Sequence, residues 1–438
     1  MTYFFETYGC QMNTAESAAM EQVLRDRGWT RSPEGKPADL VILNTCAVRA
    51  TAEQRVMGRL AQYGAWKKTR DFRLVVLGCM ASRLGEALKE QAQGVDFVIP
   101  GPASSALPRI LEELEGGQIY REKPSGPEEC FSAVHWEEGQ FRSFVPIMRG
   151  CDNFCSYCIV PYVRGREISR DPADITREIR FLAEKGVREI TLLGQNVNSY
   201  RQGDLDFAGL LERTGAETAG TAIRRVRFLT SHPKDLSSRA IRAMAENPVF
   251  CRHLHLCVQH GSNSVLQAMN RRYTREGYLA LVREIREAMP DISLSTDLLV
   301  GFPGETEEDL QKTLDLMEEV RFIYAYMYHY NPRAGTPAFT LPGRVPEEVK
   351  RERLARVMAL QKRHTREWLE SRLGRRERVL IEGISRKKAD ELITRTERDE
   401  MAVVPGRASA LGRFADLTLS SLRGNTFYAK EFDLCPGD

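Results

Sequence analysis

Between residues 141 and 330 the chain repeats one pattern: a short apolar segment, a loop and, in the first five copies, an amphipathic helical pattern. The six apolar segments end near Arg149, Gly194, Thr230, Val258, Val300 and Tyr330. Repeated strand–helix units of this length predict a (β/α) barrel, and six units predict an incomplete one. Proteins of this architecture keep their sites at the carboxyl ends of the strands, so functional residues are expected there.

Two further regions flank the predicted barrel. Residues 1–120 alternate apolar segments at 3–8, 40–45, 73–78 and 95–99 with helical patterns at 14–27 and 51–69. This alternation predicts a parallel sheet flanked by helices. Residues 374–438 hold short segments of strand character at 378–384, 391–395, 401–404 and 415–432, separated by Gly and Ser turns, and predict a small all-β barrel.

The fold class expected is therefore α/β, with three domains. We expect an N-terminal parallel sheet domain over 1–120, a linker over 121–140 that is rich in Gly, Pro and charge, a partial (β/α)6 core over 141–373 and a small β-barrel over 374–438.

Composition narrows the class of protein. The 438 residues carry 63 basic and 60 acidic side chains, a net charge of +3, so any nucleic-acid surface must be local. Residues 344–378 are such a region, with twelve Lys or Arg against six Asp or Glu, although a solvated helical face is the simpler interpretation. No apolar stretch approaches the ~18–20 residues that cross a bilayer, and no export signal precedes Cys10. We therefore expect a cytoplasmic protein without a membrane segment.

Three of the ten cysteines stand close together, as Cys151, Cys155 and Cys158. In a reducing cytoplasm, metal binding or catalysis is a better expectation than a disulfide framework. Three thiolates at this spacing can hold three corners of a four-iron cluster and leave the fourth iron open. Structural zinc is the alternative, but it normally closes four ligands in pairs, and no fourth Cys or His lies nearby in the sequence.

A second set of cysteines follows strands of the first domain. Cys10, Cys46 and Cys79 each come directly after one of the first three predicted strands. Ligands of open parallel sheets bind beyond the carboxyl ends of the strands, so these three side chains are expected to converge. Three buried cysteines that act as small apolar residues are the alternative.

At the central cysteines the sequence resembles the radical S-adenosylmethionine enzymes. The Cys151-x3-Cys155-x2-Cys158 loop, with Tyr157 before its last cysteine, matches the signature of that superfamily. Leu193-Gly194-Gln195, Thr230-Ser231-His232-Pro233 and Asp297 to Glu305 resemble its later strand-end motifs. The resemblance implies that S-adenosylmethionine binds the open iron and is cleaved reductively to a 5′-deoxyadenosyl radical. It also implies a set of cofactor-binding residues: Tyr157, Gln195, Ser231, Asp297 and Val300.

Over nearly its whole length the chain is similar to one family of these enzymes, the methylthiotransferases. They combine an N-terminal domain with three cysteines, a radical core and a C-terminal barrel of the TRAM type. The resemblance implies a second [4Fe-4S] cluster on Cys10, Cys46 and Cys79, in addition to the one on the central cysteines. It implies that one S-adenosylmethionine methylates a sulfur carried by the auxiliary cluster and that another provides the radical. We expect a monomer served by a one-electron reductase.

The local motifs resemble the branch of the family that acts on isopentenyladenosine in tRNA. They are Tyr8-Gly9-Cys10-Gln11-Met12-Asn13, Pro161 to Glu167 with Ser169-Arg170, and Asn331-Pro332-Arg333 with Gly335 to Ala338. The resemblance implies methylthiolation at C2 of N6-isopentenyladenosine at position 37, beside the anticodon, with tRNA as the partner through its anticodon stem-loop. Four arginines are candidates for substrate binding: Arg164, Arg166, Arg170 and Arg333.

Two alternatives stay open at this point. The same chemistry on N6-threonylcarbamoyladenosine in tRNA is one, and only motif-level resemblance speaks against it. The other is an RNA-binding protein whose clusters are structural, although a structural cluster would gain from four protein ligands and both proposed sites supply three. In either tRNA reading, residues 344–438 are expected to contact the RNA backbone.

One segment departs from the pattern of the family. Cys257 and His260 stand where proline and serine are expected, which puts the contacts at that strand end in doubt. His253 and His255 alternate on a strand and are expected to be packed or hydrogen-bonded rather than metal-bound. The cysteines without a partner pattern are taken as non-ligands: Cys130, Cys251, Cys257 and Cys435.

Overall fold

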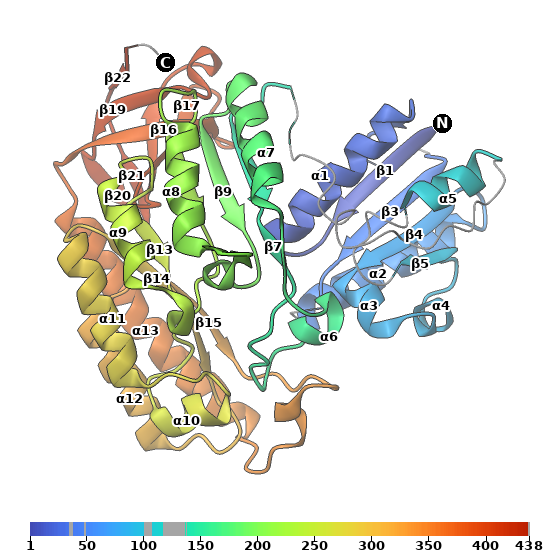
Figure 1. Cartoon of the computed structure of the whole chain (residues 1–438). Helices are drawn as coiled ribbons and strands as arrows, with labels where there is room; N and C mark the ends of the chain where they lie inside the picture. Colours follow the sequence, from blue (N-terminus) through green and yellow to red (C-terminus); the bar gives the residue numbers. More distant parts are fainter. Residues whose placement is uncertain (35–37, 48–49, 100–106, 117–135, 137, 437–438) are drawn as a thin grey trace.

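The computed structural model describes residues 1–34, 38–47, 50–99, 107–116, 136 and 138–436. Figure 1 shows three parts in chain order: a sheet domain at the N-terminus, a central set of parallel strands with helices outside them, and a C-terminal sheet. This is the expected α/β architecture. Most of the predicted linker over 121–140 lies outside the described residues.

The N-terminal domain is a parallel sheet between two layers of helices. Its strands are β1 (Thr2–Thr7), β2 (Thr30–Arg31), β3 (Leu40–Thr45), β4 (Arg73–Gly78) and β5 (Phe97–Ile99), in the order β2-β1-β3-β4-β5. Helices α1 (Gln11–Asp26) and α5 (Leu107–Leu114) share one apolar core with the sheet. The other face packs against α2 (Ala50–Trp66), α3 (Cys79–Leu84) and α4 (Ala87–Gln91). Because both faces are covered, β3 is buried along its whole length and reads in the sequence as a continuous apolar run.

The four strands expected in this domain are confirmed, and β3 and β4 have the predicted bounds. The structure adds β2, a two-residue strand beside β1 that is too short to leave an apolar pattern. It also adds α3 and α4, because the chain turns directly from β4 into helix at Cys79.

The central part is the predicted incomplete barrel. Three strands form one parallel sheet in the order β12-β9-β6: β6 (Arg142–Pro146), β9 (Glu189–Leu193) and β12 (Arg225–Phe228). Three more form a second sheet in the order β13-β14-β15: β13 (His253–His255), β14 (Ser293–Val300) and β15 (Tyr324–His329). Parallel bridges Val226–Phe250 and Ser231–Leu256 join the two sheets. The six strands thus run side by side in chain order.

One helix outside the barrel follows each of these strands. They are α7 (Pro172–Glu184), α8 (Phe207–Thr218), α9 (Ser238–Glu246), α11 (Arg275–Ala288), α12 (Glu307–Val320) and α13 (Glu347–Ser371). Together with the strands they enclose the largest apolar core of the molecule. Several begin at a side-chain cap that fixes where the helix starts; Thr306 and Asp309, for example, form a reciprocal capping box at the start of α12.

The C-terminal part is a single seven-stranded sheet in the order β20-β21-β18-β17-β16-β19-β22. Its strands are β16 (Arg376–Ile384), β17 (Glu391–Thr396), β18 (Met401–Pro405), β19 (Phe414–Thr418), β20 (Ser421–Arg423), β21 (Thr426–Tyr428) and β22 (Phe432–Leu434). The segment predicted as strand over 415–432 is divided into three strands and the start of a fourth. The chain reverses at Gly424, whose φ of +59° lies in the left-handed region that favours glycine.

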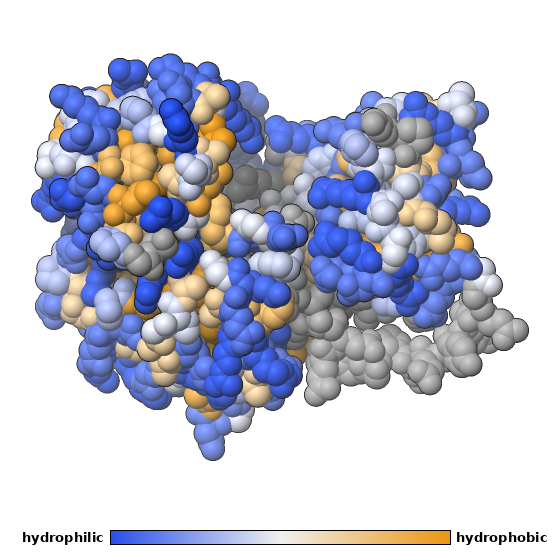
Figure 2. Space-filling view, turned by 90° about the horizontal axis from the view of Figure 1, so that it is seen from above, coloured by the Kyte–Doolittle hydropathy of each residue, from blue (hydrophilic) through white to orange (hydrophobic). Residues whose placement is uncertain are grey.

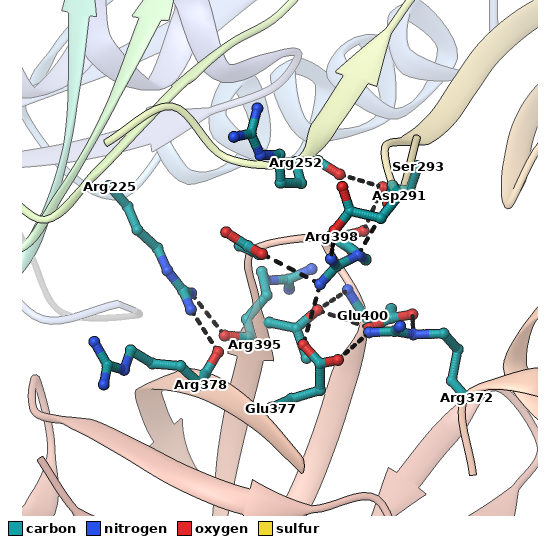
Figure 3. A network of polar contacts seen from close by, with 12 residues as sticks. Arg225, Arg252, Asp291, Ser293, Arg372, Glu377, Arg378, Arg395, Arg398 and Glu400 are labelled. Carbon is teal, nitrogen blue, oxygen red and sulfur yellow. Dashed lines mark hydrogen bonds and ion pairs between the residues drawn. The ribbon is translucent and has the colours of Figure 1, made fainter. Parts of the chain in front are cut away.

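This sheet closes the amino-terminal end of the barrel. The turn between β17 and β18 lies against the first residues of the barrel strands, and Figure 3 shows the polar contacts between the two parts. Arg227 donates to the carbonyl oxygens of Thr396 (2.8 Å) and Glu397 (3.0 Å), and Arg225 donates to those of Arg378 and Arg395. Tyr324 donates to the Asp399 carboxylate at 3.0 Å. The C-terminal sheet is therefore a structural cover of the barrel.

Most basic side chains of the segment 344–378 form ion pairs with acidic residues of the same protein. On α13, Arg353 pairs with Glu305 at 2.9 Å, and Arg363 pairs with Glu318. Beyond the helix, Arg372 pairs with Glu400 at 3.0 Å and is buried. This arrangement agrees with the simpler interpretation of the charge run, because much of its positive charge is neutralised within the fold.

Figure 2 shows the molecule from above as two masses, with the N-terminal domain on the right and the barrel with the C-terminal sheet on the left. Hydrophilic side chains cover most of the right-hand mass in this view, whereas apolar side chains gather on the left-hand one. Among the described residues, no helix has both the length and the apolar character needed to cross a membrane.

Candidate functional site

The three N-terminal cysteines follow adjacent strands of one sheet. Cys10 lies just before α1, Cys46 follows β3 directly, and Cys79 is the first residue of α3 after β4. Strands β1, β3 and β4 are neighbours and parallel, so their carboxyl ends share one edge of the sheet. Cys10 and Cys46 are close enough to act electrostatically on Cys79. The structure thus brings the three predicted side chains to one place, with Cys10 exposed and the other two buried.

Close backbone approach at this edge requires glycine. A Cβ on Gly9, whose φ is +141°, would lie 2.6 Å from Asn13 Oδ1 and 3.0 Å from the Cβ of Cys46. Asn13, which is buried, donates to Asn44 Oδ1 at 2.9 Å and accepts from the Cys10 thiol at 3.3 Å. The glycine and the asparagine pair therefore hold the turns that carry the cysteines.

The central cysteines lie on the loop that follows β7 (Met148–Arg149), a short strand paired with β8 (Ile168–Ser169). Gly150, with φ +77°, lets the chain pass directly beneath the carbonyl of Arg166, which a Cβ would overlap. The amide of Gly150 donates to Gln195 Oε1 at 2.6 Å, so the end of β9 fixes the start of the loop. The loop reaches a positive φ again at Phe154, before Cys155.

A buried arginine contacts this loop from the far half of the barrel. Arg271 donates to Cys155 Sγ at 3.4 Å and to the carbonyl of Cys257 at 2.6 Å. Asn270 donates to the carbonyl of Phe154 at 2.9 Å. Neither residue was predicted as functional, because a sequence does not distinguish a buried arginine or asparagine from one at the surface. The loop is thus tied to both halves of the barrel.

Burial keeps three of the candidate ligand thiols, those of Cys79, Cys151 and Cys158, protonated when no metal is bound. It raises the pKa of Cys158 to about 12 and that of Cys151 to about 11. It also raises the pKa of Cys79 to about 11, although the positive charge of Arg164 opposes this shift. Metal ligands must be thiolates, so loading either site would release protons.

Helix α6 (Val160–Arg164) links the two cysteine sites. It begins two residues after Cys158, and its residue Val163, together with Ile159, packs against Cys79 and Ala47 of the N-terminal domain. At its end, Arg164, whose side chain is 9% exposed, forms an ion pair with Glu16 of α1 at 2.6 Å. One cysteine of each set, Cys79 and Cys158, therefore adjoins the same short segment.

Three of the predicted cofactor residues lie at or just beyond the carboxyl ends of barrel strands: Gln195, Ser231 and Val300. Gln195 holds the cysteine loop, and Val300 ends β14. Tyr157 packs beside the apolar cluster that contains Leu299. Ser231 is buried, and its hydroxyl has no hydrogen-bond partner among the described residues.

Asp297, the fifth predicted cofactor residue, lies on β14 with its carboxylate 3.6 Å from His255 Nε2. Burial raises the pKa of this carboxyl, but the hydrogen bond and charge of His255 outweigh burial and lower it below its usual value. Asp297 therefore carries a negative charge inside the barrel.

The four candidate arginines differ in their environments. Arg166 is exposed and pairs with Asp152 of the cysteine loop at 2.7 Å. Arg164 is largely covered and pairs with Glu16, and Arg170 is buried against Glu178. Arg333 pairs with Glu53 of α2 at 3.0 Å, which connects the barrel to the N-terminal domain. Three of the four thus hold parts of the protein together.

The unusual residues beyond β13 are buried. His260 is fully buried, with Nε2 3.4 Å from Glu305, and its Nδ1 accepts from the amide of Ser262 at 3.0 Å. His253 and His255 both contact Ser295 Oγ at 2.9 Å, which agrees with the expectation of hydrogen-bonded histidines. Cys251 and Cys435 are buried, and Cys130 lies outside the described residues.

Three family models match the chain in succession. Residues 2–100 match "Uncharacterized protein family UPF0004", residues 145–317 match the radical SAM superfamily, and residues 370–430 match the TRAM domain. The order and extents agree with the three parts of the fold. The radical SAM match implies a [4Fe-4S] cluster and S-adenosylmethionine as the cofactors of this superfamily.

Solved structures share most of this fold. A radical S-adenosylmethionine methyltransferase, TsrM from Kitasatospora setae, is 18% identical, with a TM-score of 0.60 over 77% of this chain and 75% of its own. The cobalamin-dependent radical enzyme OxsB is 11% identical, with a TM-score of 0.54 over 83% of this chain and 56% of its own.

Curated relatives match nearly the whole chain. The tRNA-2-methylthio-N(6)-dimethylallyladenosine synthase of Treponema pallidum is 48% identical over 98% of this chain and 98% of its own. The enzyme of the same name from Geobacter sulfurreducens is 44% identical over 95% of this chain and 94% of its own. With this identity over its full length, and with both cysteine sets at the positions described above, the chain belongs to the family of tRNA-2-methylthio-N(6)-dimethylallyladenosine synthases.

Proposed function

We propose that this protein is a radical S-adenosylmethionine methylthiotransferase that acts at C2 of N6-dimethylallyladenosine, at position 37 of tRNA. The observation that carries the proposal is the packing of Cys79 against the segment that directly follows Cys158, in a chain 48% identical to a synthase of that name. A structural RNA-binding role would not require two incompletely ligated sites that adjoin one segment.

Each cysteine set fits a four-iron cluster with one open iron. Cys151, Cys155 and Cys158 would hold one cluster, and Cys10, Cys46 and Cys79 the auxiliary one. The donor to Cys155 Sγ, Arg271, is positively charged, which suits a thiolate that ligates iron. When bound, the clusters and S-adenosylmethionine supply one-electron cleavage, a radical and the methylthio group.

The protein's own residues position these groups and exclude water. Gln195, Asn270 and Arg271 hold the cysteine loop from both halves of the barrel. The unpartnered hydroxyl of Ser231 is available to the bound cofactor, since a buried polar group without a partner is costly. Asp297 adds a negative charge, and Tyr157 supplies apolar contact. Val300, which is fully buried in the main apolar core, would support the strand end beside them.

A nucleotide that reaches the site must pass between the N-terminal domain and the barrel. Arg166 is the one candidate arginine with most of its side chain exposed, so we assign it the contact with phosphate or base near the cysteine loop. Arg164, Arg170 and Arg333 would support that surface through their ion pairs. A one-electron reductase would serve the clusters. The closure of the barrel by its own C-terminal sheet supports a self-contained monomer.

In the C-terminal sheet, the turn between β16 and β17 is the best candidate for contact with the RNA backbone. Arg386 and Lys387 are exposed there, whereas the basic residues of α13 are partly neutralised. Replacing both with Gln should lower the slope of log affinity against log salt by about 1–2 for a tRNA stem-loop. Arg363→Gln on α13 is the matched control and should leave the slope unchanged. If the slope of log affinity against log salt is unaltered in the double variant, the C-terminal sheet has only a structural role.

The function is tested by nucleoside analysis. A strain that lacks its own synthase and expresses this chain should regain 2-methylthio-N6-dimethylallyladenosine in its tRNA, as measured by liquid chromatography and mass spectrometry. Appearance of a methylthiolated threonylcarbamoyladenosine instead would favour the second branch. Absence of any methylthiolated nucleoside, with iron content and S-adenosylmethionine cleavage intact, would refute the proposal.

The roles of the two sites are separated by two triple variants. Alanine at Cys151, Cys155 and Cys158 should abolish reductive cleavage of S-adenosylmethionine. Alanine at the three N-terminal cysteines should leave cleavage to 5′-deoxyadenosine but abolish methylthiolation. Methylthiolated product from the N-terminal variant would remove the auxiliary site from the reaction.

A further inference from the structure

A tight turn after α10 (Asn263–Ala268) forms one wall of the loop that carries the central cysteines. The amide of Ser156 donates to the carbonyl of Met269 at 3.0 Å. The side chain of Asn270 donates to the carbonyl of Phe154 at 2.9 Å. The backbone of the cysteine loop is therefore fastened to this turn at both sides of Cys155.

The backbone of this turn is strained. Asn270 has φ +57° and Arg272 has φ +58°, both in the left-handed region. Asparagine adopts that region readily, whereas arginine does so only with steric strain, which persists where the surroundings require it. Between the two, Arg271 is buried and donates to Cys155 Sγ at 3.4 Å. Arg272 is exposed, so the turn presents one arginine to a candidate cluster ligand and the next to solvent.

A second cation lies close to this turn. The pKa of His232 is lowered to about 2 by its burial and by three positive groups nearby. These groups are Arg271, Arg272 and Lys234, the last of which is exposed on the segment after β12. Lys234 pairs with Asp235 at 2.5 Å, whereas Arg271 and Arg272 form no ion pair with any residue that the structure describes. The surface beside the cysteine loop therefore carries uncompensated positive charge.

This positive surface is separate from the route proposed for the nucleotide. That route runs between the N-terminal domain and the barrel, whereas Figure 1 shows α10, which precedes the turn, on the far side of α6 from the N-terminal domain. The surface is also close to a candidate ligand of the central cluster. Arg272 adjoins Arg271 in the chain, and the guanidinium of Arg271 contacts Cys155 Sγ. Electron transfer slows steeply with distance, so an electron donor would gain by binding here.

We propose that the surface formed by Arg272 and Lys234 binds an acidic electron-carrier protein, which reduces the cluster on the central cysteines. The inference rests on the proposed function, because that function requires a reduced cluster. In this step the carrier loses one electron and the cluster gains it, and no covalent bond of the protein forms or breaks. Complexes of electron-transfer proteins bury small areas, below about 1,200 Å², and depend on complementary charge for fast encounter, so a few exposed cations suffice.

Cleavage of S-adenosylmethionine without tRNA tests this docking surface. The full chain, loaded with its clusters, is assayed for 5′-deoxyadenosine with two reductants. One is an acidic flavodoxin in its hydroquinone form, below saturation; the other is photoreduced 5-deazariboflavin, which is small and needs no docking surface. In the double variant Arg272→Glu/Lys234→Glu, the rate with flavodoxin should fall at least about tenfold. The rate with 5-deazariboflavin should be unchanged.

Salt and two single variants sharpen the test. The flavodoxin-driven rate of the wild type should fall as salt is added, and the double variant should lose this dependence. Arg272→Asn removes the charge but keeps a residue type that tolerates a φ of +58°, and it should slow flavodoxin alone. Arg242→Glu on α9 is the matched control, because Arg242 is exposed and unpaired among the described residues. It should behave as the wild type does.

Four results would overturn the proposal. The first is a wild type that flavodoxin does not reduce although 5-deazariboflavin supports cleavage. The second is an unchanged flavodoxin-driven rate in the double variant, with or without weaker binding of a tRNA stem-loop; weaker binding would make the patch an RNA surface. The third is an equal loss with both reductants at normal iron content, which would place the effect at the cluster. The fourth is an equal loss in Arg242→Glu.

A double variant that takes up no iron has lost its fold, and Arg272→Asn then decides the outcome. Failure of the proposed function has a different signature. Both reductants would support cleavage of S-adenosylmethionine, but no methylthiolated nucleoside would form when tRNA is added.

Discussion

Replacing Arg227 with Met should loosen the C-terminal sheet from the barrel. Arg227 is 7% exposed, donates to the carbonyl oxygens of Thr396 and Glu397, and lies 3.2 Å from the carboxylate of Glu189, which is 1% exposed. Met keeps much of the side-chain volume and removes the charge and both hydrogen bonds. Glu189 keeps its ion pair with Arg142 at 3.0 Å, so its negative charge stays partly neutralised.

The expected cost follows from these contacts. The two hydrogen bonds from a charged donor cost about 3 kcal/mol together, at the lower end of about 1.5–3 kcal/mol for each. The loss of the ion pair adds little, because Glu189 still pairs with Arg142. At 1.36 kcal/mol per factor of ten, the population of molecules with the β17–β18 turn undocked should rise by about 100-fold.

Hydrogen exchange measures this population directly. Peptides that cover residues 396–400 should lose about 100-fold of their protection in Arg227→Met. Arg224→Met is the matched control, because Arg224 lies three positions earlier on the same segment and is exposed. Equal protection in the two variants would refute the idea that Arg227 anchors the sheet.

Three more outcomes are expected. Gly150→Ala should prevent iron loading at the central cysteines, because its Cβ would overlap the Arg166 carbonyl and its φ is +77°; iron analysis against wild type checks this, and normal iron content would contradict it. In cluster-free protein at pH 7.5, iodoacetamide should label the exposed Cys10 well before Cys79, whose pKa is about 11. Peptide mass spectrometry follows the two labelling rates, and equal rates would contradict this expectation. Burial raises the pKa of Asp399, but the neighbouring positive groups outweigh burial and lower it to about 2. The contribution of this carboxylate to stability is therefore complete above about pH 4 and is lost as the pH falls towards 2. The urea midpoints of wild type and Asp399→Asn should converge over that interval, and a constant difference would contradict the assignment.

Local pattern was sufficient for most of the fold. The bounds of β3 and β4 follow from unbroken apolar runs, which arise because both faces of the sheet are covered. The cysteines could be placed at strand ends because parallel strands deliver their carboxyl ends to one edge. Comparable reasoning found the six strands of the barrel in their correct order.

What the sequence could not reveal is how separate parts dock. Arg227 looks like any strand arginine until the β17–β18 turn is seen to cover it, and Arg271 looks like a surface charge. Arg164 was expected at a substrate surface, whereas its side chain is largely covered and pairs with Glu16 of the N-terminal domain. Each of these depends on contacts between residues far apart in the chain.

The shortness of α6 leaves little slack between the two sets of cysteines. Five helical residues rise only about 7–8 Å, and Cys79 packs against Ile159, the residue that follows Cys158. A shift of this one segment would therefore disturb residues of both sets at once.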